Sequence, residues 1–178
     1  MHISEEYKQS HGMTPEKIAD TMLDFYARVD SACEGIVKTL AQQGHTLKCM
    51  AGCCQCCIDD LSITKAEAAV IEKLFPAFRS LNPHPSGACP FLDDHGLCRI
   101  YAARPYICRT HGLPMRWLDE TSQTEERDIC FLNDDIDILS LEPTSCWTSQ
   151  TAEIQLSILN IATFGDAERI PMRSFWEI

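Results

Sequence analysis

The sequence predicts a mainly α-helical protein, a small helical domain with irregular cysteine-rich loops and a short β-hairpin. Two long segments toward the ends of the chain carry apolar residues at helical spacing, which favours amphipathic helices. Stretches rich in Pro, Gly and Asn between them favour loops, and this middle region holds most of the eleven cysteines. The length of 178 residues fits one domain, with an N-terminal helix (14–44), a cysteine-cluster core (48–133) and a C-terminal helical segment (134–178).

The first predicted element is a long amphipathic helix over residues 14–43. Thr14 offers a hydroxyl N-cap, and Pro15 stands at the first helical position, where its fixed φ is compatible with a helix. Apolar residues then recur near the helical period, and Gly44 can end the helix. A break near Gly35 is left open, and the residues before Thr14 are expected to fray.

A second helix is predicted to begin at Thr64. Thr64 and Glu67 have the spacing of a capping box, in which each side chain satisfies a free backbone N–H of the first turn. The helix is expected to stop before Pro76, because the residue before a proline disfavours helical dihedral angles. Residues 79–88 are rich in Pro, Asn, Ser and Gly and are predicted to form a loop.

A short hairpin is predicted next. Residues 89–92 and 97–101 flank the sequence Asp-Asp-His-Gly at 93–96, which has the composition of a turn. Pairing of these two segments would bring Cys89 and Cys98 close together in space.

The last third of the chain combines a polar loop with two predicted helices. Residues 119–128 are polar and acidic, which predicts a loop or an exposed turn. A short helix is expected over Asp134–Leu141, ending before Pro143. A longer helix is expected over residues 148–164, with Gly165 just beyond its end.

The cysteines indicate a reducing compartment and metal binding. No apolar segment of a secretory signal follows the first residue, and the longest apolar-rich stretch, 154–164, is too short and too polar to span a bilayer. We therefore expect a cytoplasmic protein, whose thiols stay reduced. Eleven is an odd number, which disfavours a closed disulfide framework. The adjacent pairs Cys53-Cys54 and Cys56-Cys57 also cannot form disulfides without strain.

Eight of the cysteines form a two-part ligand pattern. Cys49, Cys53 and Cys56 stand in a C-x3-C-x2-C array, whose spacing suits convergence on one centre. Cys57 directly follows Cys56, and successive side chains diverge in non-helical backbone, so we expect two metal centres or one polynuclear centre. The expected metal ligands are Cys49, Cys53, Cys56, Cys57, Cys89, Cys98, Cys108 and Cys130.

The predicted cofactor is Zn²⁺ or iron in an iron–sulfur cluster, because both accept four thiolates. A C-x3-C-x2-C array also occurs in radical SAM enzymes. Those enzymes need most of a β/α barrel, whereas here the array lies between helix patterns in a short chain. The C-x2-C-x2-C run of bacterial ferredoxins is absent. The choice between zinc and iron therefore stays open.

A run of motifs fills the middle of the chain. They are, in order, C-x3-C-x2-C-C (49–57), Thr-x-x-Glu (64–67), Cys-Pro-Phe-Leu (89–92), Gly-x-Cys-x-Ile-Tyr (96–101), Arg-Pro-x-x-Cys-Arg (104–109), and Cys130 with Asn133. This order is similar to that of the YkgJ-like cysteine-cluster family, which is described as zinc- or iron-chelating. The resemblance covers roughly residues 48–133 and implies metal chelation by about eight cysteines, without specifying an activity.

Three cysteines lie outside this pattern. Cys33 falls on the first predicted helix and is expected in the core, and Cys146 is expected to be a bystander. Cys54 is either a bystander or an alternative ligand, and the family that the motifs resemble more often has a small residue such as glycine there. His111, three residues after Cys108, has a spacing that could add a ligand, although the cysteines already suffice.

Cations close to the thiols are expected to offset their charge. Eight thiolates on two divalent ions leave about four excess negative charges. Lys48, Arg104 and Arg109 flank the cysteines and could compensate this charge, or they could instead pair with surface carboxylates.

The remaining features limit the function classes. A net charge of -11 disfavours binding to nucleic acid or to membranes, because both require a basic surface. No phosphate loop, dinucleotide fingerprint, H-E-x-x-H or G-x-S-x-G motif occurs, so a metal-binding module is favoured over an enzyme. The alternatives are an iron–sulfur oxidoreductase, an accessory component of a protein-modifying enzyme and a metal-trafficking protein. A protein partner is left open.

Overall fold

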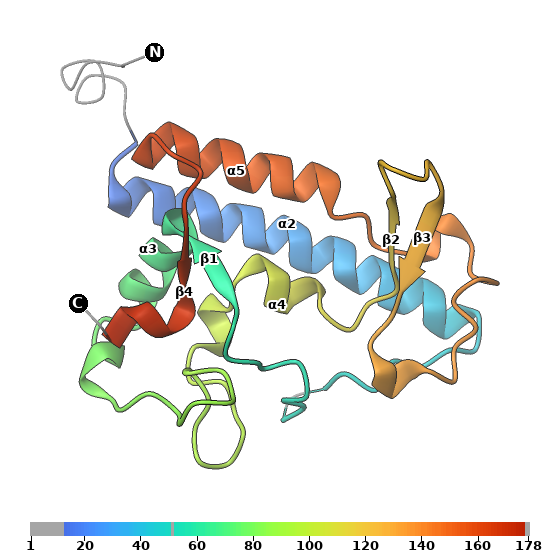
Figure 1. Cartoon of the computed structure of the whole chain (residues 1–178), viewed down its shortest axis with the longest axis horizontal. Coiled ribbons are helices and arrows are strands. Elements are labelled where there is room, and N and C mark those ends of the chain that lie inside the picture. The colour runs from blue at the N-terminus through green and yellow to red at the C-terminus, as the bar shows by residue number, and fades with distance from the viewer. Residues whose placement is uncertain (1–12, 51, 177–178) are drawn as a thin grey trace.

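A computed structural model of the chain describes residues 13–50 and 52–176 (Figure 1). The described part contains four α-helices, which are α2 (Pro15–Gln42), α3 (Lys65–Leu74), α4 (Tyr106–Thr110) and α5 (Gln150–Phe164). Two small antiparallel sheets accompany them, β1 (Ser62–Thr64) with β4 (Arg169–Pro171), and β2 (Met115–Leu118) with β3 (Glu125–Asp128). The prediction of a mainly α-helical protein is confirmed at this level. Within the described ranges, no helix has both the length and the hydropathy needed to cross a membrane.

Helix α2 forms where the sequence predicts it. The Thr14 side chain accepts a hydrogen bond from the backbone N–H of Lys17 (3.3 Å), and the helix runs without a break through Gly35. Met22 and Phe25 belong to its buried face, and burying side chains of this size contributes about 1.5–3 kcal/mol each. Helices α3, α4 and α5 all pack against α2 (Figure 1). Most of the segment that was expected to fray before Thr14 lies outside the described residues.

Helix α3 begins with the predicted capping box. The Thr64 hydroxyl accepts a hydrogen bond from the backbone N–H of Glu67 (3.2 Å), and the Glu67 carboxylate accepts one from the backbone N–H of Thr64 (2.9 Å). Glu67 is buried, and its other carboxylate oxygen accepts a hydrogen bond from the backbone N–H of Tyr106 (2.8 Å). One side chain therefore caps α3 and also holds the first residue of α4, a long-range contact that the local motif could not predict.

Helix α5 ends before Gly165, as predicted. Gly165 has a φ of 79°, in the left-handed region that glycine adopts readily at the end of a helix. Within the helix, the fully buried Asn160 accepts a hydrogen bond from the backbone N–H of Ala66 (3.0 Å) and donates one to the carbonyl of Asp166 (2.8 Å). These bonds fix α5 against the start of α3.

The residues after α5 return across the molecule and complete a sheet that the sequence pattern did not indicate. Strand β4 pairs with β1, with Ile170 opposite Ile63. The backbone N–H of Met172 donates to the carbonyl of Leu61 (2.9 Å), and Phe175 joins a cluster of aromatic rings in the core. Since Leu61 follows the first cysteine loop closely in the chain, this C-terminal segment supports that loop.

Two local predictions for the last third of the chain are wrong, the second of them only in part. Residues 134–141 form turns after a 3₁₀ segment (Phe131–Asn133) instead of a helix. The Asp137 carboxylate accepts a hydrogen bond from the backbone N–H of Leu139 (3.2 Å), and such local side-chain bonds compete with helical ones. Residues 119–128 were expected to form a loop or an exposed turn, and this prediction fails only for residues 125–128, which form β3. The mostly exposed side chains of β3 lack the alternation that marks a half-buried strand.

Candidate metal centre

The first cysteine loop contains two tight turns. The backbone N–H of Cys53 donates to the carbonyl of Met50 (3.0 Å), and the backbone N–H of Cys57 donates to the carbonyl of Cys54 (3.0 Å). Gly52 has a φ of 89°, a conformation that costs glycine little. As a result, the cysteines of this loop other than Cys54 line one cavity.

The predicted hairpin around Cys89 and Cys98 is reduced to a single bridge. Leu92 pairs with Cys98, and the chain then enters a 3₁₀ turn (Tyr101–Ala103) instead of extending the strand. The backbone N–H of Cys89 donates to the carbonyl of Cys57 (2.8 Å). This bond joins the hairpin directly to the first cysteine loop.

The last two patterned cysteines lie on or beside short helical segments. Cys108 is in α4, a helix of five residues that the sequence analysis did not predict. Because Glu67 holds the first residue of α4, the position of Cys108 is fixed from the helical core. Cys130 immediately precedes the 3₁₀ segment Phe131–Asn133.

Seven of the eight expected ligands line a cavity of about 570 Å³, which we call the cysteine cavity. These seven come from the first loop, the hairpin and α4, and they are Cys49, Cys53, Cys56, Cys57, Cys89, Cys98 and Cys108. The eighth, Cys130, lines a neighbouring cleft together with Cys56. Among the described residues, no group of three or more Cys, His, Asp or Glu side chains is arranged closely enough to hold a metal ion. The thiols therefore face a common space without converging on one point.

One set of thiols surrounds Cys49. Burial raises the pKa of the Cys49 thiol. Three neighbouring thiols raise it further, those of Cys130, Cys53 and Cys56. We call Cys49, Cys53 and Cys130 the first thiol group.

A second set of thiols surrounds Cys108. Burial raises the pKa of the Cys108 thiol well above its usual range. The neighbouring thiols of Cys89, Cys98 and Cys56 raise it further. We call Cys89, Cys98 and Cys108 the second thiol group. Cys56 is among the thiols that raise the pKa of both Cys49 and Cys108. The main cause of the raised pKa of Cys56 itself is a hydrogen bond with Cys57. The adjacent pair therefore lies between the two groups.

Two residues fix the position of Cys49. Gly112 has a φ of 95°, and a Cβ atom added to it would lie 2.2 Å from the Cys49 sulfur. Asn133 is fully buried, and its side chain accepts a hydrogen bond from the backbone N–H of Lys48 (2.8 Å) and donates one to the carbonyl of Gly112 (3.2 Å). The Asn133 amide nitrogen also lies 4.0 Å from the Cys49 sulfur. The presence of Asn133 in the motif therefore has a structural reason: its side chain holds the Cys49 thiol and the backbone of Lys48 and Gly112 in place.

Arg173, near the end of the chain, joins the two cysteine-bearing segments. Its guanidinium donates to the Asp59 carboxylate (2.6 Å), just after the first cysteine loop, and to the carbonyls of His84 (2.9 Å) and Ala88 (3.0 Å), just before Cys89. These bonds join residues that are far apart in the sequence, and no local sequence pattern predicts them. Their mark is a basic side chain that faces loop carbonyls, and this arrangement is visible only in the folded structure.

Two of the three cations expected to offset thiolate charge have carboxylate partners. Lys48 pairs with Asp135 at the surface (2.8 Å). Arg109 is nearly buried and pairs with Asp30 of α2 (2.5 Å). These pairings are the alternative that the sequence analysis left open for both residues.

Arg104 lines the cysteine cavity without a carboxylate partner among the described residues. Its guanidinium lies 4.2 Å from the centre of the Tyr101 ring, and its Nε atom is buried without a hydrogen-bond partner in the described part of the chain. Burial raises the pKa of Cys98, and the charge of Arg104 opposes that rise. The unpaired N–H of Arg104 at this cavity fits a cavity whose cysteines carry negative charge, as metal-bound thiolates would.

The three cysteines outside the pattern have different surroundings. Cys33 is buried on α2, as predicted, although it also lines the cysteine cavity. Cys54 lines neither hollow and lies against the turn at Gly96. Cys146 is buried in a small apolar cluster with Leu40. The expectation that Cys146 is a bystander stays a prediction, and for Cys54 the choice between bystander and alternative ligand stays open.

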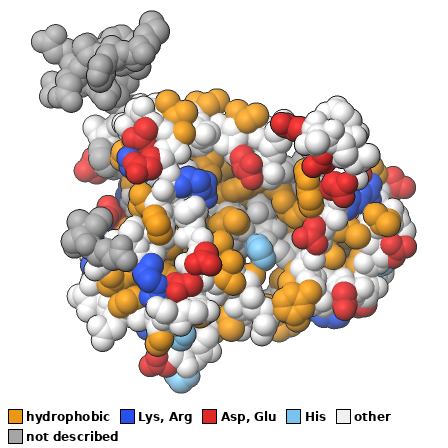
Figure 2. Space-filling model, viewed as in Figure 1, with side chains coloured by type: hydrophobic (Ala, Val, Ile, Leu, Met, Phe, Trp, Pro, Cys, Tyr) orange, Lys and Arg blue, Asp and Glu red, His pale blue; other side chains and the backbone are white. Residues whose placement is uncertain are grey.

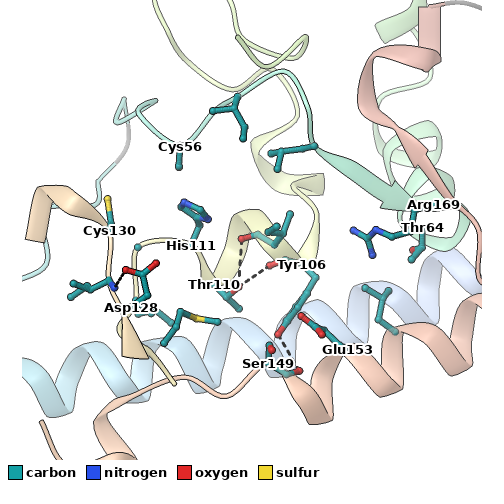
Figure 3. A pocket seen from close by; sticks show the side chains of 18 of the residues that line it. Cys56, Thr64, Tyr106, Thr110, His111, Asp128, Cys130, Ser149, Glu153 and Arg169 are labelled. Atoms are coloured by element: carbon teal, nitrogen blue, oxygen red, sulfur yellow. Dashed lines mark hydrogen bonds between the residues drawn. The ribbon is translucent and has the colours of Figure 1, made fainter. Parts of the chain in front are cut away.

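A cleft of about 880 Å³, which we call the α5 cleft, meets the cysteine cavity at Cys56 and His111. It lies between α4, α5 and the segment that carries Cys130. Figure 3 shows the His111 ring between Cys56 and Thr110. A role of His111 as an added ligand stays a prediction.

These features define a cysteine-cluster protein in which thiols far apart in the sequence are gathered on a helical core. Residues 48–131 match the family model CxxCxxCC, described as a "Putative zinc- or iron-chelating domain", which confirms the resemblance seen in the sequence. The segment ends before Asn133 and before the C-terminal segment that contributes Arg173. No curated protein and no solved structure matches the chain.

Proposed function

We propose that this protein binds two metal centres, zinc ions or iron–sulfur clusters, each through four thiolates. The first thiol group supplies three ligands to one centre and the second thiol group supplies three to the other. Of the adjacent residues Cys56 and Cys57, one supplies the fourth ligand of the first centre and the other supplies the fourth ligand of the second. The observation that carries the proposal is that this adjacent pair meets both groups: Cys56 lines the α5 cleft with Cys130, and the carbonyl of Cys57 accepts a hydrogen bond from the backbone N–H of Cys89 (2.8 Å). One polynuclear centre with the same eight ligands is the other arrangement that the pair supports.

The metal is proposed to have a structural role. The cysteines sit in turns and short helical segments, which have little regular hydrogen bonding of their own. Zinc chelation can contribute on the order of 10–16 kcal/mol per site, enough to hold such loops in one conformation. We also propose that helix α2, the cysteine core and the C-terminal segment act as one domain in the cytoplasm, where the thiols would stay reduced.

Elemental analysis and a visible spectrum of anaerobically purified protein test this proposal. Two equivalents of zinc and no colour, or iron with acid-labile sulfide and a brown colour, would support it and would identify the metal. Protein that purifies with less than about one equivalent of either metal would contradict it.

Paired cysteine variants sharpen the test. Cys98→Ser removes a proposed ligand and should lower the metal content, while Cys54→Ser removes a thiol outside both hollows and should leave it unchanged. Equal metal content in these two variants would contradict the ligand assignment.

A second candidate function is an iron–sulfur oxidoreductase or an accessory component of a protein-modifying enzyme. The α5 cleft supports it, because Cys56 and Cys130 line the cleft and a substrate there would lie beside the first centre. A colourless protein that contains zinc and no iron would eliminate the redox version.

A further inference from the structure

The α5 cleft is a concave site beside the cysteine cavity, with which it shares Cys56, His111 and Leu113. It extends from Cys130 and Asp128 at one end to Thr64 and Arg169 at the other, with His111 between the ends (Figure 3). Its volume of about 880 Å³ suits a small molecule or a few residues of a peptide. Figure 2 shows the hollow from outside, with hydrophobic side chains around it and a histidine within it.

Much of the lining of the cleft is apolar. Leu113 and Leu156 line it and are nearly fully buried. Ile58 and Phe131 also line it and are 50% and 64% exposed. A ligand for this cleft needs an apolar body, because covering the exposed apolar surface of Ile58 and Phe131 removes it from water and is favourable.

The charged groups of the cleft are mainly acidic. Glu153, in the first turn of α5, makes no side-chain hydrogen bond or ion pair with any other described residue. Asp128 adds a second carboxylate close to Cys130. Arg169 donates to the hydroxyl (3.2 Å) and the carbonyl (2.5 Å) of Ser62, so two of its donors are occupied within the protein, while its charge is outnumbered by the two carboxylates. The cleft therefore offers hydrogen-bond acceptors and negative charge to a ligand.

We propose that the α5 cleft binds a primary ammonium group on an alkyl stem, either a lysine side chain of a peptide or a free alkylamine. Glu153 accepts the ammonium group, and Leu113 and Leu156 contact the stem. In Figure 3, Asp128 and Glu153 point into separate parts of the cleft. The two carboxylates therefore fit an elongated organic cation better than a single metal ion.

The proposal rests in part on the proposed function. Four thiolates on a divalent ion leave a net charge of about −2, and Cys56 and Cys130 would place this charge at one end of the cleft. A field of this sign attracts a cationic ligand and disfavours an anionic one. The net charge of -11 for the whole chain acts in the same direction.

Isothermal titration calorimetry on the metal-loaded protein tests the proposal with two neutral-capped peptides. One is acetyl-Gly-Leu-Lys-Leu-Gly-amide, and the other has norleucine in place of lysine, which keeps the stem and removes the charge. The lysine peptide should bind about tenfold more tightly at low ionic strength, and this advantage should shrink as salt is added. Butylamine forms a third arm, because binding of butylamine without binding of the lysine peptide would assign the site to free amines.

Charge-matched variants locate the binding. Glu153→Gln should weaken binding of the lysine peptide about threefold to fivefold, and Glu120→Gln, which removes an exposed carboxylate outside the cleft, should leave it unchanged. Metal content is measured in the same samples. Metal-loaded protein that binds neither amine, or that binds the lysine and norleucine peptides equally, would overturn the inference. Protein without metal would instead contradict the proposed function.

Discussion

The position of Cys49 depends on two residues that carry no thiol. Gly112 approaches the Cys49 sulfur so closely that no side chain fits between them, and Asn133 bonds to the backbone on both sides of this contact. Both residues are distant from Cys49 in the sequence. A thiolate ligand works only when it is held at the correct place, so such residues contribute to metal affinity without touching the metal.

Replacing Gly112 with alanine is expected to disturb the first thiol group. The new Cβ would overlap the Cys49 sulfur, and the positive φ of Gly112 would cost alanine about 1–2 kcal/mol in addition. We expect loss of about one metal equivalent and a lower melting temperature, measured by elemental analysis and calorimetry.

Gly35→Ala provides the matched control. Gly35 lies in α2 with no atom near the added Cβ, so this change should retain the metal and stabilise the helix by up to about 1 kcal/mol. If Gly112→Ala kept the metal content and the melting temperature of the unaltered protein, the role given to Gly112 would be refuted.

At the scale of elements, the C-terminal segment joins parts of the cysteine core that are otherwise connected only through loops. Strand β4 pairs with β1 after the first cysteine loop, and Arg173 bonds to Asp59 and to carbonyls just before Cys89. The residues that match the family model therefore depend on a segment outside the match.

Arg173→Ala is expected to loosen residues 84–88 and the end of the first cysteine loop. The loss of charged hydrogen bonds leaves several loop carbonyls without a partner, which should lower the melting temperature and speed amide exchange in both segments. Arg28→Ala, which removes an exposed arginine of α2, is the control and should change neither quantity. Unaltered exchange over residues 84–88 in Arg173→Ala would argue against this role.

Helices were predicted correctly where residues close in the sequence determine their ends. Thr14, the capping box at Thr64 and the terminal Gly165 act on the backbone within a few residues, so the bounds of α2, α3 and α5 follow closely from them. Strand β4 could not be predicted in this way, because it forms only against β1, far away in the sequence. The helix expected over residues 134–141 failed because aspartate side chains compete for the backbone there.

The same distinction applies to the candidate site. The cysteine spacing predicted a ligand set of which seven members line one cavity, because ligands of one centre tend to come from short, patterned segments. Their role as metal ligands stays a prediction. The contacts of Gly112, Asn133 and Arg173 join distant segments, and nothing in their neighbouring residues marks them.

For the whole molecule, the apolar core and the cysteine loops are two sources of stability. The core combines side chains of α2, α3, α5 and the C-terminal segment, including Phe25, Ile71, Leu156 and Phe175. The cysteine loops lie against this core and contribute fewer buried apolar side chains. We therefore expect the helices to persist without metal and the loops to depend on it.

Removal of the metal by a chelator is expected to unfold the middle of the chain. Amide exchange should increase strongly over residues 48–60 and 84–110, the melting temperature should fall, and much of the helical circular dichroism should persist. A chelated protein with the same melting temperature and the same exchange pattern as the loaded form would disprove a structural role for the metal.

The position of Cys56 beside Cys57 has a consequence for the order in which the metals bind. A single peptide bond joins the two proposed centres, so the first ion to bind also restricts the backbone that the second ion needs. Most of the conformational entropy of the loop is then lost when the first ion binds. The second ion therefore binds more tightly than the first, and metal binding is cooperative. With metal at half the saturating amount, native mass spectrometry should show metal-free and doubly loaded molecules, with few that carry a single ion.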